Sequence, residues 1–136
     1  MPEQETIERA REDAAEGKAP STQAGEFVRE EMHHIREGKH GARSAKQAIA
    51  IGLSKARRAG VRLPPPKRGT VSEKTRKSAE SAYEQGQRNP GKRTSPKRSR
   101  ATLRALRKEG HRAASHAALS RQARSQRRHK RSTRAG

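Results

Sequence analysis

The sequence predicts a mainly α-helical protein, in which a small helical hairpin module is flanked by a charged N-terminal helix and a basic, largely disordered or partly helical C-terminal tail. Three observations lead to this fold class. Only 27% of the 136 residues are hydrophobic and 1% are aromatic. The net charge is +20, and the few apolar residues recur at helical spacing. Because so little apolar surface cannot offset an ordering cost of roughly 1 to 2 kcal/mol per residue, we expect one small folded module at most.

The first expected element is an acidic helix over residues 3–16, within an N-terminal arm of residues 1–20. Ile7 is its only large apolar residue, so we expect it to lack a stripe that could dock on a core. Residues 1–40 hold ten acidic and six basic side chains, a net charge of −4, whereas residues 41–136 hold four acidic and 28 basic ones, a net charge of +24. The acidic helix is therefore expected to compete with nucleic acid for the basic part of the chain.

A helical hairpin module is expected over residues 21–66. Its first helix begins near Ser21 and Thr22, which are favourable N-caps, and ends near Arg36. Val28, Met32 and Ile35 form an apolar stripe on this helix, with Phe27 beside it. The segment 38–41 is bracketed by glycines and predicts a turn.

The second helix of the hairpin begins at Ser44, because Gln47 three residues later completes a capping box, and it ends at Gly60. Ile49, Leu53 and Ala56 share one face of this helix. Prolines 64–66 then end regular structure, and we place the module boundary at Pro66. Since two helices make a poor core, either the module dimerises or a third helix packs on it.

The remaining chain divides into a marginal helix and linker over residues 67–90 and a basic tail over residues 91–136. Thr70 and Glu73 repeat the capping-box spacing and predict a helix over 71–86. The tail has no core-facing stripe beyond Leu103 and Leu106, so we expect it to fold along a partner rather than alone.

The strong positive charge predicts nucleic acid as the partner, since lysine and arginine release the counterions condensed on a polyanion. The hairpin resembles a helix-turn-helix whose second helix offers Lys46, Lys55, Arg57 and Arg58 to phosphates or a groove. A plain helical hairpin with solvated charges is the alternative. No Asn or Gln cluster that would read bases accompanies these cations, so binding independent of base sequence is favoured.

The run from Lys46 to Gly60, KQAIAIGLSKARRAG, resembles the signature of a small basic domain of unknown function found in bacteria and phages. The stretch from Gly25 to Gly41, GEFVREEMHHIREGKHG, is similar to the entry segment of the same family. The resemblance covers about residues 24–66. Members are sometimes labelled as DNA-binding, so it implies that role without an established activity.

Two features of the tail add to the nucleic-acid interpretation. Ser95-Pro96-Lys97-Arg98 resembles the repeats of linker-histone tails, in which a turn presents two cations to the minor groove, although a plain basic linker would contain the same residues. Residues 121–134 are rich in arginine at helical spacing. The expected phosphate contacts in this run are Arg124, Arg127, Arg128 and Arg131.

Other classes of function find little support in the sequence. His33, His34 and His40 lie near Glu30 and Glu31, but no second His-x3-His pair exists, so no metal site and no cofactor are expected. There is no cysteine and no nucleophile or phosphate-loop motif, so the protein is not expected to be an enzyme. No small-molecule substrate is expected either.

The chain has no run of 18 apolar residues and no signal peptide, and it lacks the apolar helix face that binds membrane surfaces. The expected location is therefore the cytoplasm, at the nucleoid, with no membrane partner. The expected function is histone-like coating of DNA by phosphate neutralisation. The first alternative is an RNA- or ribosome-associated protein, and the second is a homodimer through the 24–63 hairpin with a solubilising tail.

Overall fold

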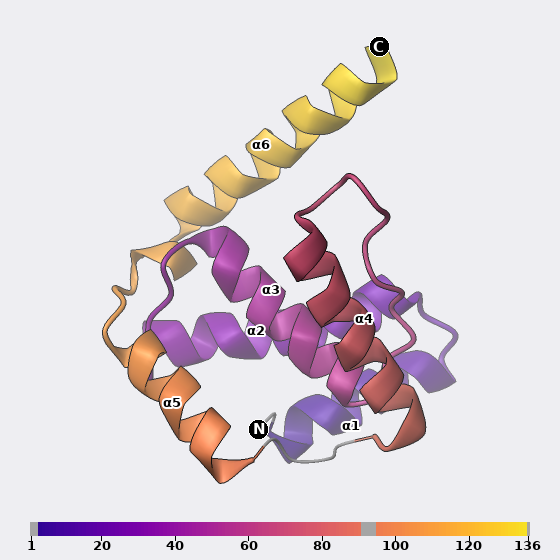
Figure 1. Ribbon diagram of the computed structural model, residues 1–136, viewed down its shortest axis with the longest axis vertical. Coiled ribbons are helices and arrows are strands. Elements are labelled where there is room, and N and C mark those ends of the chain that lie inside the picture. The colour runs from indigo at the N-terminus through magenta and orange to yellow at the C-terminus, as the bar shows by residue number, and fades with distance from the viewer. Residues whose placement is uncertain (1–2, 91–94, 136) are drawn as a thin grey trace.

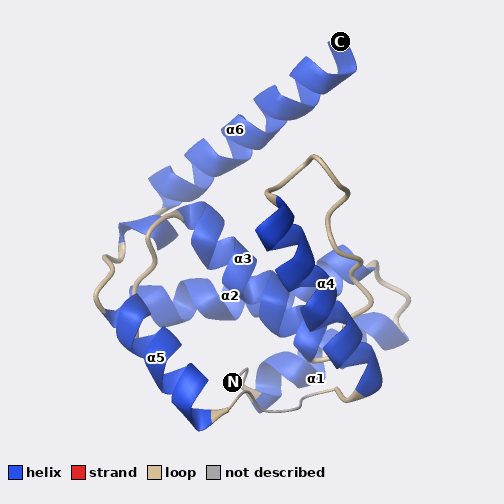
Figure 2. Cartoon of the chain, in the orientation of Figure 1, coloured by secondary structure: helices blue, strands red, loops and turns tan. Residues whose placement is uncertain are grey.

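The computed structural model describes residues 3–90 and 95–135, with side chains described as far as Arg127 in the last helix (Figure 1). These residues form six α-helices and one 3₁₀ turn and include no β-strand, so the predicted mainly α-helical class is confirmed (Figure 2). None of the described helices is long and apolar enough to span a membrane. In chain order the elements are α1 (Gln4–Ala15), α2 (Pro20–Arg36), α3 (Ala45–Arg58), α4 (Glu73–Arg88), α5 (Pro96–Arg107), η1 (Arg112–Ala114) and α6 (His116–Ala135).

The predicted hairpin is formed by α2 and α3, which pack on each other. Helix α2 begins at Pro20 rather than at Ser21, because proline fits the first helical position, and no side chain caps it. It ends where Gly38 adopts a φ of 81° and Lys39 N donates to His34 O at 3.0 Å. This left-handed glycine ends the helix and turns the chain toward α3.

The predicted bounds of α3 are confirmed by its caps. Ser44 Oγ accepts a hydrogen bond from Gln47 N at 3.1 Å, and the Gln47 side chain accepts one from Arg43 N at 2.6 Å. At the other end Gly60 has a φ of 105°, and Val61 N donates to Ala56 O at 3.1 Å. Both expected signals, the capping serine and the terminating glycine, therefore operate.

Helix α1 docks on α2, contrary to the expectation that it lacks a docking face. Thr6, Ala10 and Asp13 are buried at intervals of four and three residues and so line one side of α1. Ile7 packs beside this side, against the cluster that contains Phe27. The expectation counted only large apolar residues, whereas small side chains let two helices approach closely. Among the described elements α1 contacts α2 alone.

The core consists of two clusters of buried side chains at the two ends of the hairpin. Phe27 and Ile35 are its largest apolar members and are 1% and 0% exposed, a burial of about 1.5 to 3 kcal/mol each. One cluster contains Ala10, Ala24, Phe27, Ala56 and Val61, and the other contains Met32, Ile35, Ala42, Ala48, Ala113 and Ala114. Within one chain, α1 and η1 thus supply the additional packing that a two-helix module needs.

Helix α4 packs on α3 through Ala79, Ala82 and Gly86, which are its buried residues. Its N-cap is Ser72, whose Oγ accepts a hydrogen bond from Thr75 N at 3.2 Å, and not the predicted Thr70. The helix therefore begins and ends two residues later than the predicted span of 71–86, because serine at 72 competes for the same capping role.

The segment expected to be a tail returns to the core before it projects outward. Ala113 and Ala114 of η1 are 7% and 0% exposed, and Arg36 Nε donates to Ala114 O at 2.9 Å. This contact has no signal in the sequence, because two alanines in a basic stretch form no periodic stripe. Beyond η1, helix α6 begins against α3, where Leu119 packs on the core, and its C-terminal part then extends away from the other helices (Figure 1).

Candidate nucleic-acid interface

Helix α5 carries a row of exposed cations and has no fully buried residue. Lys97, Arg100, Arg104 and Arg107 recur at intervals of three or four residues, which places them along one face. All four are exposed, and none forms an ion pair with a described residue. The helix contains no acidic residue. We call these four residues the α5 cation row.

The Ser-Pro unit before this row begins a helix, and so forms neither the turn that the resemblance to linker-histone repeats implies nor a plain linker. Ser95 Oγ accepts a hydrogen bond from Arg98 N at 3.3 Å, and Pro96 occupies the first helical turn. Serine is a good N-cap and proline fits the first turn of a helix, so the dipeptide favours helix initiation here. Lys97 and Arg98 are both exposed, as predicted for contacts, although Arg98 lies off the cation row.

The C-terminal end of α5 is fastened to the loop that follows α2. Gly41 N donates to Leu106 O at 2.9 Å, and Ala42 N donates to Gly110 O at 3.0 Å. A Cβ atom at Gly41 would lie 2.1 Å from Glu109 O, so only glycine allows this approach. Leu103 and Leu106 are half-buried, while the cation row remains exposed.

Helix α6 presents a second group of cations. Arg124 and Arg127, both predicted contacts, are exposed, and so is Arg121. The side chains of the other two predicted contacts, Arg128 and Arg131, lie outside the part of the chain whose side chains are described. The helix sequence from His116 to Ala135 contains no acidic residue, so nothing within it neutralises these arginines.

Arg57, which the sequence predicts as a phosphate contact, lies inside the fold in the structure. Its side chain is buried, and its guanidinium donates to Leu63 O and to Pro64 O at 3.2 Å each. Burial lowers the pKa of this guanidinium from its usual value. The sequence could not show that α4 and the 61–64 segment cover this part of α3.

The other predicted contacts on α3 differ in their availability. Lys46 is exposed near the start of the helix. Lys55 is ion-paired with Glu31, and its side chain is 25% exposed. Arg58 is half-buried and engaged within the fold. The structure therefore does not bring the four α3 cations together as one free surface.

Residues 19–68 match a family of unknown function, DUF6496. The match spans α2 and α3 and ends before α4, close to the range of the resemblance noted from the sequence. No curated protein and no solved structure matches the chain. Both α5 and α6 lie outside the residues that the family covers.

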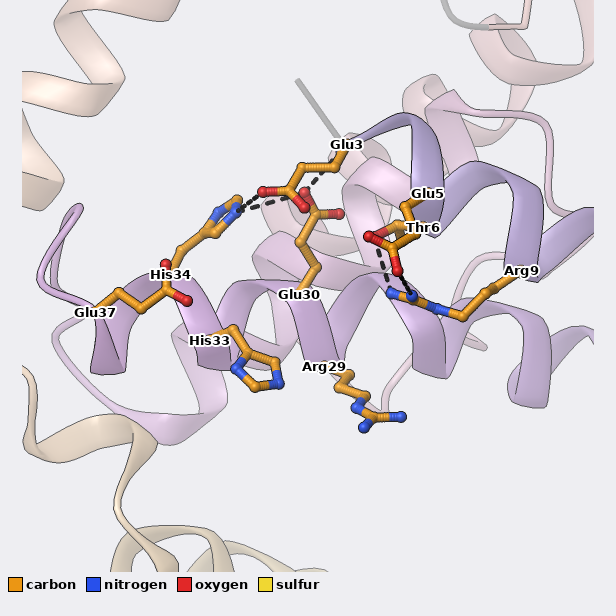
Figure 3. A pocket seen from close by; sticks show the side chains of 9 residues that line it. All are labelled: Glu3, Glu5, Thr6, Arg9, Arg29, Glu30, His33, His34 and Glu37. Atoms are coloured by element: carbon orange, nitrogen blue, oxygen red, sulfur yellow. Dashed lines mark hydrogen bonds and ion pairs between the residues drawn. The ribbon is translucent and has the colours of Figure 1, made fainter.

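A polar hollow of about 250 Å³ opens between α1 and α2 (Figure 3). His34 Nε2 lies 3.3 Å from Glu3 Oε1 and 3.5 Å from Glu30 Oε1 in this hollow. The hydrogen bond from His34 is the main influence on Glu3 and, with nearby Lys39, holds the pKa of that carboxyl below its usual value. Carboxylates line this hollow, so it is unsuited to phosphate.

Sequence reasoning missed one set of functional candidates and rejected another as a metal site. Arg100, Arg104 and Arg107 were not among the predicted contacts, although their spacing from Lys97 was a readable signal of one helical face. The second set is Glu31, His34 and His40, whose ligand atoms all lie within 4.8 Å of one another. Glu31 and His34 are one helical turn apart, but no spacing signal could place His40 beside them.

Proposed function

We propose that the protein binds nucleic acid independently of base sequence, DNA in preference to RNA, and coats it in a histone-like, nucleoid-associated manner. The observation that carries this proposal is the α5 cation row on a helix with no buried residue and no acidic residue. A helix that contributes so little to the core has its cations available for a partner. The exposed arginines of α6 extend the same chemistry.

The dimensions of the α5 cation row suit duplex DNA. Ten residues separate Lys97 from Arg107, so the row is about 15 Å long at about 1.5 Å per residue. Duplex DNA carries one phosphate charge per about 1.7 Å of helix axis when both strands are counted, so a 15 Å length offers about nine phosphates. Phosphates are thus in ample supply for four cations.

The composition of α5 favours phosphate contacts over base contacts. The helix contains no Asn or Gln, the side chains that pair with adenine in the major groove. Its cations are regularly spaced, which suits a repeating backbone. A DNA major groove admits a helix, whereas the major groove of double-stranded RNA is too narrow, so duplex DNA is the favoured partner.

Neutralising the α5 cation row is expected to weaken DNA binding by about 100-fold or more at moderate salt and to reduce the salt slope by about 3 to 4. The variant is Lys97→Gln, Arg100→Gln, Arg104→Gln and Arg107→Gln, measured by fluorescence anisotropy on a random-sequence duplex. Each cation that is removed eliminates about one phosphate contact, so binding releases about one fewer counterion from the DNA.

The matched control removes four positive charges from another exposed surface, with Lys67→Gln, Arg68→Gln, Lys74→Gln and Lys77→Gln. We expect this control to bind within about fivefold of the unaltered protein, because long-range charge alone is screened beyond about 10 Å at 0.1 M salt. An equal loss for both variants would show that net charge, and not the α5 cation row, governs binding.

A further inference from the structure

Glu31, His34 and His40 converge inside the fold, next to the turn that joins α2 to α3. Glu31 of α2 is 0% exposed, and His40 in the turn is 6% exposed. His40 Nε2 lies 3.1 Å from Glu31 Oε2, and His34 Nδ1 lies 4.0 Å from Glu31 Oε1. One buried carboxylate is thus flanked by one nitrogen from each of two imidazoles.

The outer nitrogen of each imidazole has its own acceptor. His40 Nδ1 lies 2.9 Å from Gly41 O, a carbonyl that can only accept, so this nitrogen carries the proton. His34 Nε2 faces the carboxylates of Glu3 and Glu30 at 3.3 and 3.5 Å. In neutral rings the inner nitrogens are then unprotonated and direct their lone pairs toward Glu31. Metal-binding histidines are held in this way by a carbonyl or carboxylate behind them.

Glu31 Oε2 is buried and has no hydrogen-bond partner among the described residues, although His40 Nε2 is only 3.1 Å away. The two atoms are close without being aligned for a hydrogen bond. Two ligands of one metal ion show the same geometry, because each directs its lone pair at the ion and not at the other ligand. Zinc ligands about 2.0 to 2.2 Å from a tetrahedral ion lie about 3.3 Å apart.

We propose that Glu31 Oε2, His34 Nδ1 and His40 Nε2 bind one divalent transition-metal ion of the zinc class. Lys55 pairs with the other oxygen of Glu31, and this contact can persist as an outer hydrogen bond to the ligating carboxylate. The carboxylates of Glu3 and Glu30 add negative charge behind His34. Glu31, His34 and His40 each offer one ligand atom, and these atoms lie within 4.8 Å of one another, so side-chain shifts of about 1 Å close the site.

The donor set selects the class of ion. Two imidazole nitrogens and one carboxylate oxygen suit Zn²⁺ and Co²⁺, whereas Mg²⁺ and Ca²⁺ prefer oxygen ligands alone. The absence of a His-x3-His pair argued against a metal from the sequence. In the structure the turn after α2 supplies the second histidine instead, and Gly41 O orients it.

The test is titration of the full-length protein, first freed of metal with a chelator, with Zn²⁺ alone and with Co²⁺ as a coloured probe. We expect one equivalent of Zn²⁺ to bind, visible Co²⁺ absorption typical of nitrogen and oxygen ligands, and no competition from millimolar Mg²⁺. Nitrogen chemical shifts of the imidazoles should identify His34 Nδ1 and His40 Nε2 as the bound atoms.

His34→Gln and His40→Gln are each expected to weaken Zn²⁺ binding by at least about 100-fold, because each removes a ligand. Losing a residue that only supports a ligand from outside usually costs about 10- to 100-fold. The matched control is His33→Gln, which alters an exposed histidine outside the cluster and should change affinity less than about twofold, because it removes neither a ligand nor an outer contact. Circular dichroism checks that each variant remains helical.

If a variant fails to fold, a measurement on the unaltered protein still tests the proposal. In that case zinc-dependent protection of amides 39–42 from hydrogen exchange is the expected result, because His40 would be held to α2. The absence of one-equivalent binding, or an equal loss of binding in His33→Gln, would overturn the proposal and show only adventitious zinc on surface histidines.

Discussion

Replacing Gly52 with alanine is expected to lower the free energy of unfolding by about 3 kcal/mol, the upper end of the usual cost of overpacking. A Cβ atom at this position would lie 2.6 Å from Val28 Cα and 3.0 Å from Val28 N. These are backbone atoms of α2, so relief requires that the two helices of the hairpin move apart. Urea denaturation followed by circular dichroism measures the change.

Gly25→Ala is the matched control for this substitution. Gly25 lies in the interior of α2 and is exposed, and a Cβ atom added there would have no described atom within 4 Å. Because alanine favours helix over glycine by about 1 kcal/mol, this variant should be as stable as the unaltered protein or slightly more stable. Equal destabilisation of the two variants would contradict the close crossing of α2 and α3.

Replacing Lys55 with glutamine is expected to cost about 3 kcal/mol of stability, and replacing Glu31 with glutamine distinctly less. The Glu31 side chain is 0% exposed and the Lys55 side chain 25% exposed. Loss of Lys55 therefore leaves a buried carboxylate without its cation, whereas loss of Glu31 leaves an ammonium that can reach water on its flexible stem. The measurement is urea denaturation with a chelator present.

The double variant Glu31→Gln, Lys55→Gln isolates the interaction between the two side chains. We expect it to be more stable than Lys55→Gln alone, because the uncompensated buried charge is gone. If Glu31→Gln proved the more damaging single change, the pair would not be stabilising a buried carboxylate as described.

Helices with strong local signals could be predicted from the sequence. The caps of α3 at Ser44 and Gly60 act through short-range hydrogen bonds and backbone conformation, which neighbouring residues determine. By contrast, the docking of α1 depends on Thr6, Ala10 and Asp13, whose burial has no apolar signal. The insertion of Ala113 and Ala114 into the core likewise depends on tertiary packing alone.

The candidate interface could be predicted only in part, for a related reason. Positive charge identifies cations but does not say which of them tertiary structure covers. Arg57 is buried by packing that follows it in the chain, whereas Lys97 remains exposed on a helix that buries none of its residues. The convergence of His40 with Glu31 depends on the turn after α2, and no periodic pattern encodes that geometry.

Binding of the full chain to a random-sequence DNA duplex across a series of salt concentrations tests the proposed nucleic-acid binding most directly. A structured RNA of equal length serves as the comparison. We predict tighter binding to DNA and a log-log slope near −0.9 per neutralised phosphate, with roughly six or more contacts from α5 and α6. Negligible binding to either nucleic acid at moderate salt would contradict this role and would direct attention to the α2–α3 hairpin as a protein-binding module.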